Sequence, residues 1–244
     1  MKKRLICIIL AIAALSIPVA LASCDEPSGP IQQNDSPYLV LVNKQNPAGE
    51  SYEPHDLITV DAAYTTGGKE ISLNKTAAQA VIKMLDAMKK DGIDNVTVTS
   101  AYRTYAYQQK LFNKYLADER TAHPDWTEEQ IKNKVLTYSA APGTSEHQTG
   151  LCVDLFTDEM EGLWNYGSET PNNPYDKGFA ETEAFKWLQK HAHEYGFILR
   201  FPENKTEVTG YAYESWHYRY VGVEHATKIH KNGITLEEYL KNQK

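Results

Sequence analysis

Two short stretches of the sequence hold side chains that can bind a metal ion. In the stretch SEHQTGLCVDL, His147 lies in a Gly- and Ser-rich segment and Asp154 interrupts a short apolar run. In the stretch ESWHYRY, His217 begins a second apolar run three residues after Glu214. An ionised aspartate away from water is costly unless it is paired, hydrogen-bonded or bound to a metal. The two stretches therefore suggest a shared site, and the alternative is a structural aspartate with ordinary core histidines.

The residue types match the chemistry of a hydrolytic zinc centre. Two imidazoles and a carboxylate, here His147, His217 and Asp154, make a three-ligand set that leaves the fourth zinc position open to water. Zinc lowers the pKa of that water, and a carboxylate such as Glu214 can carry its proton to a leaving group. Residues three apart on a regular strand point to opposite faces, so Glu214 must lie in a turn or bulge. Spacing alone leaves the zinc interpretation open, because both spacings also occur by chance.

Two nucleophilic alternatives use residues of the first stretch. Cys152 has a histidine nearby in sequence, as a cysteine peptidase would require. Strand alternation places it on the same face as Asp154, where a small buried thiol is ordinarily inert packing, although it would line the site if that face borders the metal. A serine peptidase would need a base poised against Ser145 and a third residue to orient that base. The sequence offers no such signature.

A mixture of helices and short strands must position these residues. Apolar residues at helical spacing predict helices over residues 76–90, 105–118, 127–138 and 181–195, with a closing helix in the TLEEYL tail. Alternating or β-branched runs predict strands over residues 95–100, 151–156, 197–201 and 216–221, and a strand or extended segment over residues 38–42. Thr127 and Gln130 fit a capping box. Because the elements follow no regular βαβ rhythm, the pattern favours an α+β fold.

The N-terminus has the anatomy of an export signal. Basic residues precede an almost unbroken apolar run, and small residues then precede Cys24. The run is nearly long enough to span a membrane, so an uncleaved anchor is the alternative. The ending LASC resembles the lipobox of bacterial lipoproteins, in which the signal is cut just before a cysteine that is then acylated. The resemblance implies a signal peptide over residues 1–23, a lipidated Cys24 and a flexible tether over residues 24–37.

Charge and cysteine content limit the classes of protein that this chain can be. Loss of the three basic residues of the signal would take the formal net charge from −7 to −10, whereas a nucleic-acid binder would carry a basic face. Cys7 lies in the signal and Cys24 would be lipidated, which leaves Cys152 without a disulfide partner. Residues 38–244 are enough for one domain with a sizeable core. We therefore expect a monomer with a single domain that binds no nucleic acid.

Three blocks of the sequence resemble the motifs of one enzyme family. SEHQTGLCVDL is similar to the S-x-H-x-x-G-x-x-x-D motif of the VanY-type D-alanyl-D-alanine carboxypeptidases, the zinc DD-/LD-carboxypeptidases of peptidase family M15B. ESWHYRYVG resembles the E-x-W-H-x-R-Y motif of that family, and SAYRTYAYQQKLF resembles its S-x-Y-R-x-x-x-x-Q segment. The resemblance covers residues 38–222. It implies a hedgehog/DD-peptidase-like α+β fold, with a small, mainly antiparallel sheet that is flanked by helices and carries the zinc site.

Position by position, the resemblance implies a role for each residue of these motifs. It implies one Zn²⁺ per domain bound by His147, Asp154 and His217, a catalytic base at Glu214, and substrate contacts from Arg103, Gln108 and Ser145. The planar guanidinium of Arg103 suits a terminal carboxylate or a tetrahedral oxyanion, and the amide of Gln108 offers a donor and an acceptor to a peptide. Without the family pattern, a surface arginine, a solvated glutamine and a turn serine are the alternatives.

The resemblance also implies a substrate and a place in the cell. It implies that the enzyme removes the C-terminal D-alanine from peptidoglycan stem peptides while Cys24 anchors it to the outer side of a bacterial cell membrane. The alternatives are an L,D-carboxypeptidase that acts on tetrapeptide stems, a peptidoglycan endopeptidase, and a non-catalytic lipoprotein that binds the cell wall. A degenerate binding protein would be expected to lose ligands or the base, and all four residues are present.

Overall fold

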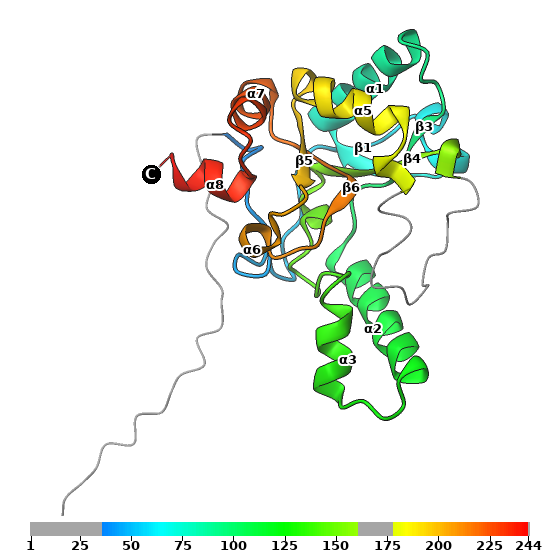
Figure 1. The fold of residues 1–244 in the computed structure, drawn as a ribbon, viewed down its shortest axis with the longest axis vertical. Helices are drawn as coiled ribbons and strands as arrows, with labels where there is room; N and C mark the ends of the chain where they lie inside the picture. The colour runs from blue at the N-terminus through cyan, green and yellow to red at the C-terminus, as the bar shows by residue number, and fades with distance from the viewer. Residues whose placement is uncertain (1–35, 161–177, 244) are drawn as a thin grey trace, which may run out of the picture.

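A four-stranded antiparallel sheet forms the centre of the molecule (Figure 1). The computed structural model describes residues 36–160 and 178–243. In spatial order the strands are β3 (Val96–Ser100), β4 (Cys152–Thr157), β6 (Glu214–Tyr220) and β5 (Phe197–Phe201). Each neighbouring pair runs antiparallel. The expected α+β fold with a small antiparallel sheet is thus confirmed.

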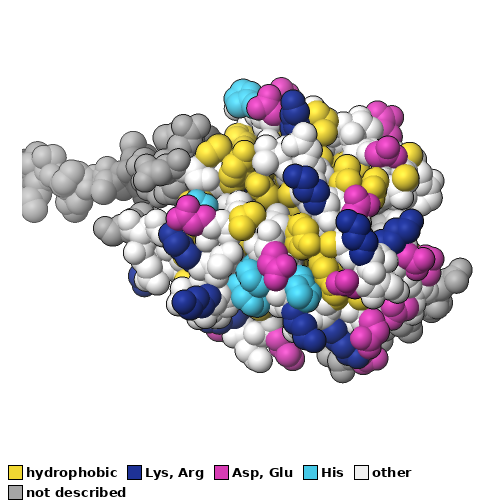
Figure 2. All heavy atoms as spheres, turned by 90° about the horizontal axis from the view of Figure 1, so that it is seen from above, with side chains coloured by type: hydrophobic (Ala, Val, Ile, Leu, Met, Phe, Trp, Pro, Cys, Tyr) yellow, Lys and Arg dark blue, Asp and Glu magenta, His cyan; other side chains and the backbone are white. Residues whose placement is uncertain are grey.

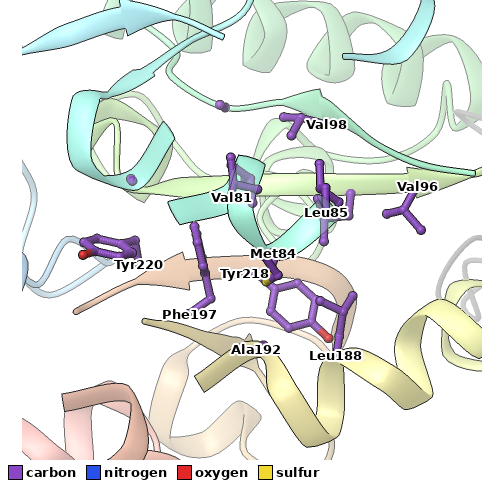
Figure 3. Close-up of a cluster of buried hydrophobic side chains, with 14 of the residues drawn as sticks. Val81, Met84, Leu85, Val96, Val98, Leu188, Ala192, Phe197, Tyr218 and Tyr220 are labelled. Atoms are coloured by element: carbon purple, nitrogen blue, oxygen red, sulfur yellow. The ribbon is translucent and has the colours of Figure 1, made fainter. Parts of the chain in front are cut away.

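Helices and apolar side chains cover one face of this sheet. The helices α1 (Lys75–Lys90) and α5 (Glu183–His191), the latter continued by the 3-10 turn η5 (Ala192–Tyr195), pack against it. Figure 3 shows Met84 and Leu188 from these helices beside Tyr218 of β6. Because successive strand residues point to opposite faces, Val153 and Leu155 of β4 join this core while Asp154 points the other way.

A second, smaller core holds the C-terminal helices. Here α7 (Val223–Asn232) and α8 (Leu236–Lys241) pack with Ile198 of β5 and with Leu39, which lies in a segment without regular secondary structure near the N-terminal end of the described chain. The main chain of this segment is held by Arg219, whose Nη2 donates to the carbonyls of Tyr38 and Val40 at 3.0 and 2.6 Å. The two ends of the domain thus meet on one flank of the sheet.

The helices α2 (Tyr105–Ala122) and α3 (Glu128–Val135) form a hairpin that projects from the body (Figure 1). The start of α3 carries a capping box: Thr127 Oγ1 accepts from the Gln130 N–H, and the Gln130 side chain accepts from the Thr127 N–H. The remaining short elements are β1 (Leu57–Thr59), η1 (Ala62–Tyr64), η2 (Thr66–Gly68), β2 (Ser72–Asn74), η3 (Glu146–Thr149), η4 (Asp158–Met160) and α6 (Thr206–Thr209).

Most elements that the sequence predicts are present, with three differences. The helix expected over residues 105–118 continues to Ala122, and the tail, expected to be one closing helix, forms two helices, α7 and α8. Residues 38–42 form no strand: Tyr38 lies in a turn and residues 39–42 have no regular secondary structure. The predicted signal peptide, Cys24 and most of the tether lie outside the described residues, as do residues 161–177. Across the described ranges, no helix is both long and apolar enough to cross a membrane. On the face shown in Figure 2, basic and acidic side chains are interspersed.

Candidate metal centre

Strand pairing brings two of the candidate ligands together. In the antiparallel register of β4 and β6, Asp154 lies directly opposite His217. The Nδ1 atom of His217 lies 2.9 Å from Oδ1 of Asp154. Directly paired residues on one face of an antiparallel sheet have neighbouring Cβ atoms, so this contact follows from the register. The same pairing would fail if either strand slipped by one residue.

The tight turn before β4 supplies the third candidate ligand. Turn η3 ends at Gly150, whose φ of 65° lies in the left-handed region that strains other residues. A Cβ at this position would also lie 2.8 Å from Cδ2 of Leu57, so any other residue would have to displace that side chain as well as adopt a strained φ. The turn carries His147 back toward β4, where its Nε2 lies 3.3 Å from Oδ2 of Asp154. The structure therefore brings His147, Asp154 and His217 together.

The outer nitrogen of each imidazole is held by a second hydrogen bond. The Nδ1 atom of His147 donates to the carbonyl of Ala101 at 2.5 Å. The Nε2 atom of His217 donates to Oε1 of Glu146 at 2.9 Å. These bonds fix the orientation of both rings and direct His147 Nε2 and His217 Nδ1 toward Asp154. Metal-binding histidines are typically held in this way.

The atoms that face one another in this cluster, which are His147 Nε2, His217 Nδ1 and the Asp154 carboxylate, can together bind a cation. Burial and the charge of Arg103 oppose protonation of His147, yet the charge and hydrogen bond of Asp154, together with the neighbouring Cys152, outweigh them and raise the pKa of His147 to about 9. A proton or a metal ion must separate the imidazole nitrogens from the carboxylate, because all of them present electron pairs. Zinc binds imidazole in its neutral form and would displace these protons. Two nitrogen donors and one carboxylate, all buried, form a recognised catalytic zinc set.

Glu146 is a component of the site that sequence reasoning missed. Its side chain is buried, and its Oε2 accepts from Arg200 Nε and Arg219 Nη1, each at 2.9 Å. Burial alone would raise the pKa of Glu146, but the charges of Arg200 and Arg219 outweigh burial and hold it well below the usual range. A signal was present in the sequence: the two arginines stand inside apolar strands, and a buried arginine needs a carboxylate partner.

The bulge in β6 places Glu214 beside the ligands. Leu199 pairs with Tyr218 but Phe201 pairs with Glu214, so β6 carries two more residues than β5 across this step. The expected bulge is therefore confirmed. It leaves Oε2 of Glu214 3.6 Å from Nδ1 of His217. Burial raises the pKa of Glu214 to about 7, which suits a group that must accept and return a proton.

A cavity opens beside this cluster and receives the predicted substrate contacts. Its lining includes Arg103, Gln108, Ser145, Glu214 and Trp216. The guanidinium of Arg103 donates to Oδ2 of Asp154 and to Oγ of Ser100, in each case at 2.8 Å from Nη2. Gln108 Nε2 donates to the carbonyl of Ala140 at 2.8 Å. Its Oε1 has no hydrogen-bond partner among the described residues, which leaves an acceptor for a ligand in the cavity.

Cys152 lies beside the candidate ligands. Potential ligand atoms of His147, Cys152 and His217 lie within 4.8 Å of one another. The strand face that holds Cys152 therefore does border the metal site, as the sequence left open. Its side chain is fully buried and is not among the residues that line the cavity. A thiol in this position cannot reach a peptide in the cavity, which argues against a cysteine peptidase.

The profile of one protein family matches most of this region. The VanY profile, described as D-alanyl-D-alanine carboxypeptidase, aligns with residues 70–223. The chain belongs to the VanY family. The aligned segment contains the VanY-type motifs and the entire cluster of His147, Asp154, Glu214 and His217.

Individual VanY relatives agree with this assignment. A D-alanyl-D-alanine carboxypeptidase of Enterococcus faecalis is 36% identical over 206 residues, which are 84% of this chain and 66% of the relative. The solved structure of VanYB in complex with D-alanine-D-alanine is 36% identical, with a TM-score of 0.65, and the match covers 85% of this chain and 99% of VanYB. A VanY mutant from the VanB-type resistance cassette has also been solved with Zn(II).

A further structural neighbour has a different specificity. The LdcB L,D-carboxypeptidase, solved in a study of peptidoglycan recognition, is 36% identical with a TM-score of 0.67. The match covers 82% of this chain and 84% of LdcB. VanYB and LdcB therefore resemble this chain to almost the same degree. The comparison supports a zinc carboxypeptidase more firmly than it supports a preference for a D,D- or an L,D-stem peptide.

Proposed function

We propose that this chain is a zinc-dependent D-alanyl-D-alanine carboxypeptidase that removes the C-terminal D-alanine from peptidoglycan stem peptides. The observation that carries the proposal is the convergence of His147 Nε2 and His217 Nδ1 on Asp154, with Glu214 3.6 Å from His217 at the wall of a cavity. Bound zinc would polarise the scissile carbonyl and lower the pKa of a water molecule.

Glu214 performs the proton transfers of the proposed reaction. Its carboxylate takes a proton from the attacking water as the new C–O bond forms at the scissile carbonyl. It then gives that proton to the nitrogen of the departing D-alanine as the C–N bond breaks. A pKa of about 7 lets one group do both near neutral pH. No other proton carrier is required for the balance of the reaction.

Arg103, Gln108 and Ser145 hold the substrate in the proposed complex. The guanidinium of Arg103 pairs with the terminal carboxylate, which is how the enzyme selects chain ends. Oε1 of Gln108 accepts from a peptide N–H, and its Nε2 stays bound to the Ala140 carbonyl. Ser145 is buried at the cavity wall, where its hydroxyl can bond a peptide group.

The proposed location is the outer side of the cell membrane, with the chain anchored through a lipidated Cys24. The support is the sequence ending LASC after an apolar run with a basic start. A domain tethered there by residues 24–37 would face its peptidoglycan substrate. Metabolic labelling with a radioactive fatty acid tests the anchor: label should enter the wild type and be absent from Cys24→Ala.

The second candidate is removal of D-alanine from L,D-tetrapeptide stems, and the similarity to LdcB favours it. Purified protein should be incubated with a D,D-pentapeptide stem and an L,D-tetrapeptide stem, with D-alanine release measured by mass spectrometry. Release from the pentapeptide supports the main proposal, and release from the tetrapeptide alone supports the second candidate.

Controls in the same assay separate zinc catalysis from contamination. Chelation of zinc and the Glu214→Ala variant should each abolish release, and added zinc should restore it only in the chelated wild type. Glu207→Ala, which removes an exposed glutamate from α6, should keep full activity. Release that persists after chelation, or that is equal in the two glutamate variants, would rule out the proposed mechanism.

A further inference from the structure

Glu146 stands between the metal ligand and a buried ionic network. Its Oε1 accepts from the Nε2 of His217, while its Oε2 accepts from both Arg200 and Arg219. The side chains of Arg200 and Arg219 are completely buried. The two oxygens of one carboxylate thus have separate tasks: one holds the imidazole, and the other is fixed by two guanidinium groups.

The network continues to the C-terminal helix. Arg200 donates through Nη1 and Nη2 to the two carboxylate oxygens of Glu237 in α8, at 2.9 and 2.7 Å. A bidentate pair of this kind fixes the plane of the guanidinium as well as its position. The line of contacts therefore runs from Glu237 through Arg200 and Glu146 to His217, and joins helix α8 to a candidate metal ligand.

A gain in the stability of the folded protein does not by itself explain why such a network is present. The two guanidiniums and the Glu146 carboxylate are buried here, Glu237 is partly buried, and a buried ionic cluster is often no more stable than well-packed apolar residues. What apolar residues cannot do is accept the Nε2 proton of His217 with a fixed geometry. The orientation of that ring decides whether Nδ1 points at the metal.

We propose that Glu146 is a positioning residue for the metal ion, and that Glu237 acts on the same ion through Arg200. Glu146 holds His217 with Nδ1 directed at the metal, and helix α8 completes the site through the bidentate Arg200–Glu237 pair. This inference rests on the proposed function, because it requires that His217 binds zinc.

The test measures zinc affinity and coordination apart from activity. Zinc binding to the full chain is measured by competition with a chromophoric chelator, and the ligand-field spectrum is recorded after substitution with Co²⁺. Glu146→Gln should weaken zinc binding by about tenfold to a hundredfold, which is typical for loss of a partner that orients a ligand. Glu237→Ala should weaken it by roughly threefold to tenfold, a smaller effect because it acts through Arg200. Both should shift the Co²⁺ spectrum.

Glu238→Ala is the matched control for Glu237→Ala. Glu238 is the next residue of α8, pairs with Lys205 at 2.9 Å and accepts the N–H of Thr235 in a capping box. Its removal costs the same helix an ion pair and a cap, yet its hydrogen bonds go to Lys205 and Thr235 and not to Arg200 or Glu146. Glu238→Ala should therefore lower the thermal midpoint of the zinc-free protein while leaving zinc affinity and the Co²⁺ spectrum unchanged.

The outcomes separate the inference from the function on which it rests. Wild-type protein that binds no zinc would overturn both. Wild-type protein that binds zinc and releases D-alanine, with Glu237→Ala indistinguishable from Glu238→Ala in zinc affinity and spectrum, would overturn the positioning role alone. If Glu146→Gln fails to fold, the pair of α8 variants still decides the question.

Discussion

The two faces of the central sheet are built on different principles. On one face, Leu155 and Tyr218 pack with α1 and α5 into an apolar core where volume and shape decide the fit. On the other, Asp154, His217 and Arg219 are held by hydrogen bonds and ion pairs to groups from distant segments. Apolar packing tolerates small changes in position, whereas a metal site does not.

The difference matters because the same strands serve both faces. Asp154 stands between Val153 and Leu155, which are both completely buried in the apolar core. The core thus fixes the backbone from which the candidate ligand projects. We expect variants of the core face to lower stability and to spare catalysis in the molecules that remain folded. Variants of the site face should instead lower catalysis more than they lower stability.

The largest effect should come from Glu214→Gln on the site face. The amide cannot accept the proton of the attacking water, so kcat/KM should fall by about a hundredfold to ten-thousandfold. Zinc content should stay at the wild-type level, because Glu214 is the proposed base and binds no metal. Steady-state kinetics and metal analysis on one preparation check both statements. A large loss of zinc would instead make Glu214 part of the metal-binding set.

Leu155→Ala tests the core face one residue away from the candidate ligand Asp154. Leu155 is completely buried, and its truncation should lower the free energy of unfolding by about 3 kcal/mol. Urea denaturation gives this value. The kcat/KM of the folded fraction at low temperature should stay within about twofold of the wild type. A loss of activity as large as that of Glu214→Gln would show that the two faces are not separable.

Acid should weaken the ionic network before it weakens the apolar core. The pKa of Glu146 in the folded protein lies below its ordinary value of 4.5. Its contribution to stability is therefore complete above about pH 4.5 and is lost as the pH falls toward the lower folded pKa. Between about pH 5 and pH 3, the zinc-free wild type should lose up to about 1.4 kcal/mol per pH unit through this one group. Urea denaturation at several pH values should show a shallower slope for Glu146→Gln.

The smallest effect should come from Tyr218→Phe in the apolar core. The Tyr218 hydroxyl is buried, has no hydrogen-bond partner among the described residues, and burial raises its pKa well above the usual value. Its removal relieves an unsatisfied polar group, so the free energy of unfolding should rise by about 1 kcal/mol. Activity should not change, although the next residue in the chain is Arg219. Destabilisation by Tyr218→Phe would mean that the hydroxyl has a bonding role.

Local elements of this protein could be predicted because their signals are local. The capping box of Thr127 and Gln130 and the periodicity of α1 depend on residues three or four positions apart. The tail forms two helices, α7 and α8, where the sequence predicted a single closing helix, and Gly233, whose φ of 61° lies in the left-handed region, ends α7. The bulge at Glu214 could be predicted from geometry: on a regular strand that side chain would point away from His217.

The sequence by itself determined the chemistry of the candidate site, since two imidazoles, an aspartate and a glutamate in recurring motifs are compatible with few kinds of site other than a zinc centre. The tertiary structure alone decided which groups hold them in place. Glu146, Arg200, Arg219 and Glu237 come from a turn, two strands and a helix that are distant in the chain. Their contacts depend on the register of β5, β4 and β6 and on the docking of α8. No local pattern encodes such a contact, because an ion pair needs only that two opposite charges meet after the chain has folded.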